Sequence, residues 1–485
     1  MKIVLGGGIA AAIAIASCSH KDDAPTYFDR STMLDPETCK QCHATHYEEW
    51  SGSMHAYAAD DPVFLAMNAR GQRETNGALG TFCVKCHAPM AVREKATTDG
   101  TNLGALPKKL KGVTCLFCHS VSDVTDTHDN PLVLADDLTM RASYKDPVAN
   151  GAHRAGYSAL HDRSRLESSQ LCGACHDIVN GHGVSLERTF DEWKKSVFAS
   201  SPGGATCGQC HMAQSPNLTP IAQNVQGVFA RRTHAHTFAG VDVALTPWPH
   251  ADDQKQAVQS LLDTTLQTAL CVAPLGGGAS SLRVIVDNVA AGHSWPSGAV
   301  QDRRAWFEVV AYSGGNVIYQ SGVVADGTAV TAANDPDLWL LRDCMFAGDK
   351  EVHMFWDALS LDGAQLPGQA TFDQTDPRYY QTHVVQTWPR GNRTIMGVPD
   401  RVTLRVRLQP MGLDVLDDLV ASGDLAKATR DAMTTWQVGK TLEWTPATAT
   451  LKYMEDRTML SCVSTTNLNV QADKVPATVP TKCKP

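Results

Sequence analysis

The sequence lacks three things that would point to a familiar class of protein. Its N-terminal apolar run, Ile3 to Ser17, is far too short to span a bilayer, and no other membrane segment is visible. A formal net charge of −9 argues against a nucleic-acid partner. Residues 275–485 contain no nucleophile motif and no clustered pair of acids. The unusual residues lie instead before residue 245, where 11 of the 15 cysteines are found.

Ten of these cysteines belong to one repeated pattern, C-x-x-C-H. Chance predicts about 0.02 matches in a chain of this composition, yet five occur between residues 39 and 211 and none in the remaining half. The first cysteines are Cys39, Cys83, Cys115, Cys172 and Cys207. The second cysteines are Cys42, Cys86, Cys118, Cys175 and Cys210, followed directly by His43, His87, His119, His176 and His211.

Three chemistries use paired cysteines at this spacing. A zinc ribbon takes two pairs per ion, which leaves one of five pairs unmatched and gives the histidines no role. A thioredoxin-like redox pair normally occurs once, in a βαβ unit. Covalent c-type haem uses all three positions, because two thiols bind the porphyrin and the adjacent imidazole binds the iron. The pattern therefore predicts five haem c groups.

The N-terminus agrees with export, which this form of haem attachment requires. The apolar run ends Ile15-Ala16-Ser17-Cys18, which looks like a bacterial lipoprotein signal with Cys18 as the lipidated residue; the alternative is an ordinary cleaved signal. No acidic residue directly follows Cys18, which favours the outer membrane, on its periplasmic or cell-surface side. Cys271, Cys344, Cys462 and Cys483 remain; they suggest two disulfides with three possible pairings, or unpaired thiols.

The pattern of residues predicts an α+β multidomain chain. We expect a signal peptide over 1–17, a flexible tether over 18–35, a mostly helical or irregular pentahaem domain over 36–245, a connecting helix over 246–274 and an antiparallel β-sandwich over 275–485. In the haem domain we expect short amphipathic segments such as Glu37–Trp50 and Leu186–Ser196, with the porphyrins supplying much of the buried surface. One helix, Leu413–Thr435, interrupts the sandwich.

A weak internal repeat accompanies the motifs. Glu49–His55, EWSGSMH, follows the first motif, and Glu192–Phe198, EWKKSVF, follows the fourth. Each precedes another C-x-x-C-H, so a pair of haem sites is a candidate for duplication, with His55 standing where the second copy has Phe198. Shared helix composition is the alternative explanation.

Several stretches resemble a group of bacterial multihaem cytochromes c. They are CKQCHATHYEEWSGSMHA, KGVTCLFCHS, GAHRAGYSALHDRSRLESSQLCGACHD, TFDEWKKS, HAHTFAGVDVAL and AGHSWPSGAVQDRRAWFEV. The group is related to the tetrahaem cytochrome that accepts electrons from hydroxylamine oxidation, here with an appended β-sandwich, and is similar to surface cytochromes of metal-reducing bacteria. The resemblance covers residues 36–310 and implies electron transfer through mostly bis-histidine haems.

The same resemblance suggests which histidines bind the second axial position of each iron. The candidates are His55, His153, His161, His234, His236 and His293, the last reaching from the sandwich to a haem; His46, His128 and His182 rank lower, and His250, His353 and His383 are typical of ordinary core or surface residues. The expected role is single-electron transfer between redox protein partners. Two alternatives stay open: an enzyme that reduces or oxidises a small nitrogen or sulfur compound at one five-coordinate haem, and a self-assembling cytochrome filament.

Overall fold

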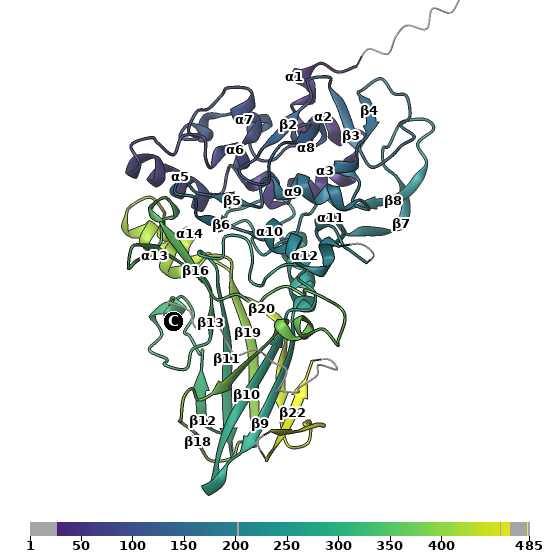
Figure 1. The fold of residues 1–485 in the computed structure, drawn as a ribbon. Coiled ribbons are helices and arrows are strands. Elements are labelled where there is room, and N and C mark those ends of the chain that lie inside the picture. Colours follow the sequence, from purple (N-terminus) through teal and green to yellow (C-terminus); the bar gives the residue numbers. More distant parts are fainter. Residues whose placement is uncertain (1–26, 201–202, 456, 466–482, 484–485) are drawn as a thin grey trace, which may run out of the picture.

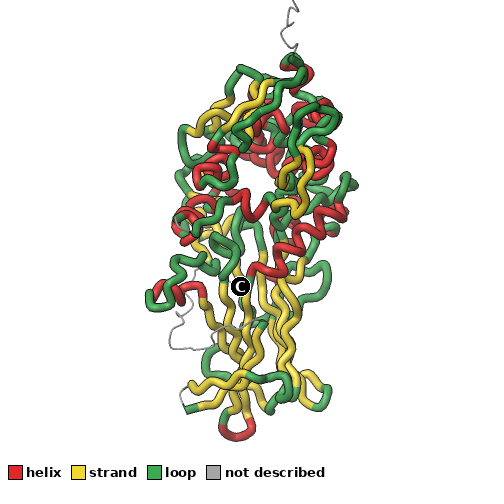
Figure 2. Tube along the Cα trace, turned by 90° about the vertical axis from the view of Figure 1, so that its right-hand side faces the viewer, coloured by secondary structure: helices red, strands yellow, loops and turns green. Residues whose placement is uncertain are grey.

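The computed structural model describes residues 27–200, 203–455, 457–465 and 483. The expected signal peptide, Cys18 and most of the tether lie outside these residues. In the described part of the chain no helix combines the length and the hydropathy needed to cross a membrane. The molecule has the expected α+β organisation, with short helices at one end and long antiparallel strands at the other, as Figures 1 and 2 show.

The first half is made of short helices and two-stranded ribbons. The motifs account for the short helices, because each C-x-x-C-H occupies a single helical turn between loops. The helices are α1 Arg30–Met33, α2 Pro36–Lys40, α3 Ala44–Ser51, α4 Met54–Tyr57, α5 Pro62–Glu74, α6 Val84–His87, α7 Pro89–Arg93, α8 Cys115–Ser120, α9 Ser169–Gly173, α10 Thr189–Lys195 and α11 Cys207–His211. The ribbons pair β1 Val121–Val124 with β2 Leu132–Leu134, β3 Thr139–Ala142 with β4 Arg154–Tyr157, β5 Ile178–Val179 with β6 Ser185–Glu187, and β7 Gln214–Pro220 with β8 Ala230–His234.

Two of the expected amphipathic segments are broken in the structure. Residues 37–50 are divided between α2 and α3, because His43 leaves the helical conformation with φ −115° and ψ 46°. Residues 186–196 begin in β6 and only then form α10. The first half of the chain also has more apolar core than we expected from its motif density: Phe64, Leu103 and Phe117 belong to a cluster of buried side chains around the second and third motifs.

The connecting helix ends earlier than the sequence suggests. α12 covers Ala251–Thr265, and Gln267–Pro274 is already the strand β9, so the predicted helix is wrong over residues 266–274. Leu270 continues the helical spacing of Leu262 and Leu266, but its side chain is buried in a sheet. An apolar run of this length is compatible with either element, and period alone does not separate them.

The second half is a β-sandwich whose two antiparallel sheets share one apolar core. One sheet has the order β17-β10-β9-β22-β21, with β18 beside β10, and the other β12-β11-β19-β20, with β13 beside β11. Leu282, Val284 and Val286 of the first sheet lie in the same buried cluster as Phe307 and Val309 of the second. The bounds are β10 Ala279–Asp287, β11 Arg304–Ser313, β12 Asn316–Ser321, β13 Leu340–Leu341, β17 His383–Trp388, β18 Ile395–Met396, β19 Arg401–Gln409, β20 Trp436–Trp444, β21 Leu451–Glu455 and β22 Thr458–Ser464; a third sheet joins β14 Asp343–Ala347 to β15 Lys350–Val352 and β16 Ser360–Gly363.

The predicted helix Leu413–Thr435 is two helices, α13 Leu413–Ala421 and α14 Lys427–Asp431. Gly423 separates them with φ +81°, a left-handed conformation that ends a helix and that glycine adopts without strain. α13 packs beneath α5 of the first half (Figure 1), where Val63 and Met67 share a buried cluster with Leu416. This contact fixes one side of the sandwich to the motif-bearing half.

Two disulfides join the four remaining cysteines. Cys271 of β9 pairs with Cys462 of β22, and Cys344 of β14 pairs with Cys483. The structure therefore selects one of the three pairings that the sequence left open. Cys271 and Cys462 are opposite each other in neighbouring strands and are both fully buried.

Candidate cofactor-attachment sites

All five C-x-x-C-H motifs form a single helical turn. In the first, second and fourth motifs the backbone N–H of the histidine donates to the carbonyl of the first cysteine, over 2.8 Å for His43, 3.2 Å for His87 and 3.0 Å for His176. The third and fifth motifs begin α8 and α11. One turn brings the first cysteine and the histidine to the same face of the helix. None of the ten motif cysteines is in a disulfide, so every thiol is available for attachment.

The five motif histidines also share a hydrogen-bonding arrangement. In each, Nδ1 contacts a protein oxygen, which fixes the ring and makes Nδ1 the protonated nitrogen. Nε2 is then the nitrogen left to bind a metal. The acceptors are the carbonyls of Ile221 for His43 (2.7 Å), Ala58 for His87 (3.2 Å), Arg141 for His119 (2.6 Å) and Ala239 for His211 (2.7 Å), and the carboxylate of Glu187 for His176 (3.0 Å).

Burial gives most of these imidazoles the protonation state that iron requires. Desolvation lowers the pKa of His43, His87, His119 and His211, which favours the neutral ring. His176 differs: burial lowers its pKa, but the hydrogen bond and the charge of Glu187 outweigh burial and raise it to about 9. Paired thiols beside an oriented, mostly neutral imidazole fit covalent haem with a histidine axial ligand.

Four of the five motif histidines face a second imidazole. A metal binds imidazole nitrogen at about 2 Å, so two rings that share one metal have centres about 6 Å apart. The observed pairs match this spacing. They are His43 with His153 at 6.2 Å and an interplanar angle of 29°, His176 with His55 at 6.3 Å and 50°, His119 with His236 at 6.4 Å and 22°, and His211 with His293 at 6.5 Å and 10°.

The second imidazoles of three pairs are oriented in the same way as the motif histidines. Nδ1 of His153 donates to the carbonyl of Arg154 (2.9 Å), Nδ1 of His236 to that of His234 (3.0 Å) and Nδ1 of His293 to that of Ser294 (2.7 Å). Burial lowers the pKa of His55 to about 3, so its ring is neutral as well. These four candidates therefore have a nitrogen suited to a second axial bond.

Two of the six candidates are placed differently. His161 lies 5.7 Å from His119, but its Nε2 donates to the carbonyl of Cys118 over 2.8 Å, which withdraws that nitrogen from a metal. His234 is half-buried and shares no ring contact with a motif histidine among the described residues; its carbonyl serves His236. His46, ranked low by sequence, contacts His236 at 4.7 Å edge to face.

His87 is the exception among the five motif histidines. Its ring stacks on the phenyl ring of Phe64, with centres 4.1 Å apart and planes within 3°. Among the described residues no second imidazole faces it at the spacing found in the other four pairs. The second motif thus has the attachment residues of the others without their paired histidine.

Contacts between cysteines show which motifs are neighbours. The thiols of Cys39 and Cys115 are close enough to shift each other's pKa, and so are those of Cys172 and Cys207. Cys86 and Cys175 form the same kind of contact, and Cys118 is close enough to Cys175 to raise its pKa. The first motif therefore adjoins the third, the third adjoins the fourth, and the fourth also adjoins the second and fifth. The arrangement is branched, with the fourth motif at the branch.

The internal repeat is confirmed as a repeat of structure. Trp50 donates from Nε1 to the carbonyl of Val113, two residues before the third motif, over 2.8 Å. Trp193 donates in the same way to the carbonyl of Ala205, two residues before the fifth motif, over 2.8 Å. The backbone N–H of Val113 donates to the carbonyl of His55 over 2.8 Å. In the second copy the N–H of Ala205 donates to the carbonyl of Phe198 over 2.9 Å.

A glycine permits this close approach in both copies. A Cβ on Gly112 would lie 2.6 Å from the carbonyl oxygen of His55, and one on Gly204 would lie 2.7 Å from that of Phe198. The repeat thus explains the shared Gly-x-Thr-Cys before the third and fifth motifs. In the first copy His55 reaches His176 of the next unit, whereas in the second copy Phe198 has no such nitrogen and lies against Phe372.

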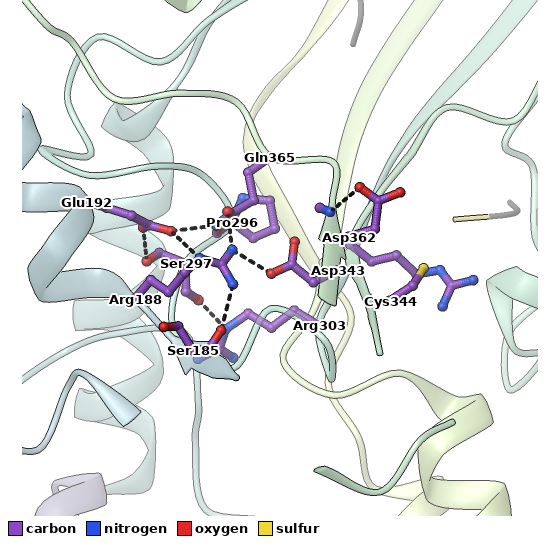
Figure 3. Close-up of polar contacts among 12 residues, drawn as sticks. Ser185, Arg188, Glu192, Pro296, Ser297, Arg303, Asp343, Cys344, Asp362 and Gln365 are labelled. Atoms are coloured by element: carbon purple, nitrogen blue, oxygen red, sulfur yellow. Dashed lines mark hydrogen bonds and ion pairs between the residues drawn. The ribbon is translucent and has the colours of Figure 1, made fainter. Parts of the chain in front are cut away.

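The sandwich supplies His293 from a loop that is held by polar contacts to α10. Ser297 donates to Glu192 over 2.7 Å and hydrogen-bonds with Thr189 over 2.8 Å. Arg188 bridges the halves, donating to Asp343 and to Gln365 over 2.6 Å each, as Figure 3 shows. Because Asp343 and Gln365 belong to the sandwich, this network fixes the loop and its histidine against the fifth motif.

Two comparisons with known proteins agree with this geometry. Residues 38–120 match the family described as cytochrome c554 and c-prime. The fold resembles the crystal structure of a penta-haem cytochrome c552 from Thermochromatium tepidum, with a TM-score of 0.55 and 19% identity, over 84% of this chain and 98% of that one. No curated protein matches the sequence. The family match is confined to the part of the chain that holds the first three motifs, and the structural likeness concerns the fold.

The sequence did not reveal Glu187 or Phe64. Glu187 reaches His176 only because the β5–β6 ribbon folds back, and β5 has just two residues, too few for a recognisable alternation. Phe64 lies on α5, before the second motif, and nothing in its spacing indicates that it stacks on His87.

Proposed function

We propose that this chain carries single electrons through five covalently bound haems. Two thiols of each motif bind the porphyrin and the motif histidine supplies one axial nitrogen, while His153, His55, His236 and His293 supply the second for the first, fourth, third and fifth haems. The observation that carries the proposal is the shared orientation of the five motif histidines, each held through Nδ1 so that Nε2 is left for iron.

The branched order of the motifs suggests the route. Electrons pass between the first, third and fourth haems, and from the fourth to the second or the fifth. Bis-histidine ligation closes the iron to substrates, so such haems transfer electrons but bind no substrate at the iron. Donor and acceptor are redox proteins that dock on the chain.

Mass spectrometry of the mature protein tests the attachment. We expect the added mass of five haem groups, and peptides from each motif that carry one haem. Replacing the cysteine pair of one motif, for example Cys207 and Cys210, is expected to remove a single haem. A mature protein with fewer than five haems, or with zinc at these cysteines, would refute the proposal.

We also propose that the protein is an outer-membrane lipoprotein anchored at Cys18. The supporting observation is the apolar run that ends Ile15-Ala16-Ser17-Cys18. Cys18→Ala is expected to move the protein from the membrane fraction to a soluble fraction. If the wild-type protein is already released without detergent, the anchor is absent.

A second function is favoured by the stacking of Phe64 on His87. A haem at the second motif without a second imidazole is five-coordinate, and an open iron can bind and reduce or oxidise a small nitrogen or sulfur compound. Electron paramagnetic resonance should then show one high-spin haem, and cyanide or nitric oxide should bind at one haem per chain. Five low-spin signals and no ligand binding would leave electron transfer alone.

A further inference from the structure

One motif histidine has a different kind of hydrogen-bond acceptor from the other four. Nδ1 of His43, His87, His119 and His211 contacts a neutral backbone carbonyl, whereas Nδ1 of His176 contacts a carboxylate oxygen of Glu187 at 3.0 Å. The Glu187 side chain is 15% exposed, whereas the His176 side chain is 51% exposed. The difference concerns the fourth motif, which adjoins the second, third and fifth.

The chain builds this contact locally. In the β5–β6 ribbon Glu187 is paired with Ile178, which follows His176 by two residues, so the carboxylate returns to the imidazole. The N–H of Phe190 then donates to the carbonyl of His176 over 3.1 Å. Gly173, inside the motif, lets Phe190 pack here, since a Cβ at this position would lie 2.3 Å from the phenyl ring. The carboxylate is therefore positioned by backbone structure on both sides.

Apart from His176, no basic side chain among the described residues forms an ion pair with Glu187. Burial raises the pKa of Glu187, but the hydrogen bond and the charge of His176, followed by the charge of Arg303, lower it overall. Arg303 is itself paired with Asp242 over 3.3 Å and donates to the carbonyls of Ser297 and Pro410. A net negative charge thus remains beside the His176 ring.

We propose that Glu187 lowers the reduction potential of the haem bound by His176. The inference rests on the proposed haem attachment. A charge-assisted hydrogen bond to Nδ1–H makes the imidazole a stronger donor to iron, and a nearby negative charge favours the ferric state, which has one more positive charge. Glu187 is a positioning and tuning residue, and the four haems with carbonyl acceptors lack its effect.

The fourth motif lies at the branch point, so the reduction potential of its haem affects electron transfer to three neighbouring haems. An electron that reaches a low-potential branch point leaves for a neighbouring haem instead of remaining there. Glu187 therefore keeps the fourth haem oxidised for most of the time, so that it distributes electrons between the second, third and fifth haems.

Glu187→Gln tests the proposal on the intact protein with all haems attached. Glutamine keeps the size and a hydrogen-bond acceptor but removes the charge. In an optical redox titration we expect one of five components to shift upward, with the ratio of oxidised to reduced haem at fixed potential falling about tenfold, which corresponds to about 59 mV for one electron. Asp191→Asn is the matched control: it removes the half-exposed carboxylate of a residue four positions along the chain, on α10, and should leave all five components in place.

Two further measurements keep the outcomes distinct. Glu187→Asp retains the charge at a shorter reach, and it should shift the same component upward by less; this variant replaces the glutamine variant if that one loses haem. Five unshifted components in both variants, with five haems present by mass, would overturn the role of Glu187 alone. Absence of haem from the Cys172–Cys175 peptide of the wild-type protein would overturn the proposed function instead.

Discussion

His293 lies on the sandwich, yet its ring faces that of His211 in the fifth motif with centres 6.5 Å apart and planes within 10°. Asn288 holds the loop, donating from its side chain to the carbonyl of His293 over 2.8 Å. The two halves of the molecule are therefore joined at a candidate iron site as well as through packing.

His293→Ala is expected to open the fifth haem. Removal of one axial nitrogen turns a low-spin iron into a high-spin one, so electron paramagnetic resonance should gain one high-spin signal per chain. His182→Ala is the control, since His182 is exposed and has no ring contact with a motif histidine among the described residues. An unchanged low-spin spectrum in His293→Ala would show that this histidine does not bind iron.

His236 and His161 both approach His119, and replacing each in turn separates them. His236→Ala is expected to produce a high-spin third haem, because His236 has the spacing of a shared metal. His161→Ala should keep the wild-type number of low-spin haems, since Nε2 of His161 is engaged with the carbonyl of Cys118. The opposite result would exchange their roles.

Asp302 makes the stability of the sandwich depend on pH. Burial raises its pKa from 3.8 to about 6, and one of its carboxylate oxygens has no hydrogen-bond partner among the described residues. A raised pKa means that the folded state holds the proton more tightly. The stability that protonated Asp302 gives the folded state is fully present below about pH 3.8 and is lost as the pH rises through about 6. By pH 7 the free energy of unfolding is lower by on the order of 2–3 kcal/mol.

Asp302→Asn should therefore raise the free energy of unfolding at pH 7 and have little effect near pH 4. Urea denaturation followed by tryptophan fluorescence at several pH values measures the difference. Asp349→Asn, at an exposed position in the sandwich, is the control and should follow the wild type. A constant difference between Asp302→Asn and wild type across this range would contradict the assignment.

The Cys271–Cys462 disulfide joins two adjacent strands inside the sandwich. Replacing both cysteines by alanine is expected to lower the free energy of unfolding of this half by about 2–4 kcal/mol, because the unfolded chain gains freedom. The haem absorbance spectrum of the folded protein should stay the same, since both cysteines lie far along the chain from the motifs. An unchanged urea midpoint would show that packing alone holds these strands together.

The sequence predicted the features that depend on local chemistry. The five motifs need only adjacent residues, and strands such as β10 and β19 alternate or bury residues that favour sheets. Four stretches rich in β-branched and aromatic residues, at 281–289, 305–313, 316–324 and 401–409, all overlap strands of the structure. The α+β organisation followed from these two signals together.

What the sequence did not determine depends on contacts between distant segments. His153 and His161 lie eight residues apart before the same motif, and only the folded chain shows that His153 faces His43 while His161 is bound to a backbone carbonyl. The end of α12 was misplaced because buried strand and helix share an apolar pattern there. The apolar cluster around Phe117 was underestimated because it gathers side chains from several separate loops.

The Phe198 position gives the duplicated unit a definite end. In the first copy the equivalent residue is His55, and its ring faces that of His176 in the following copy. The second copy offers a phenyl ring, so the series stops there, and the sandwich completes the last site with a histidine of its own. The β-sandwich thus ends the repeat by occupying the place where a further copy would lie. Adding a third copy would require both Phe198→His and displacement of the loop that carries His293.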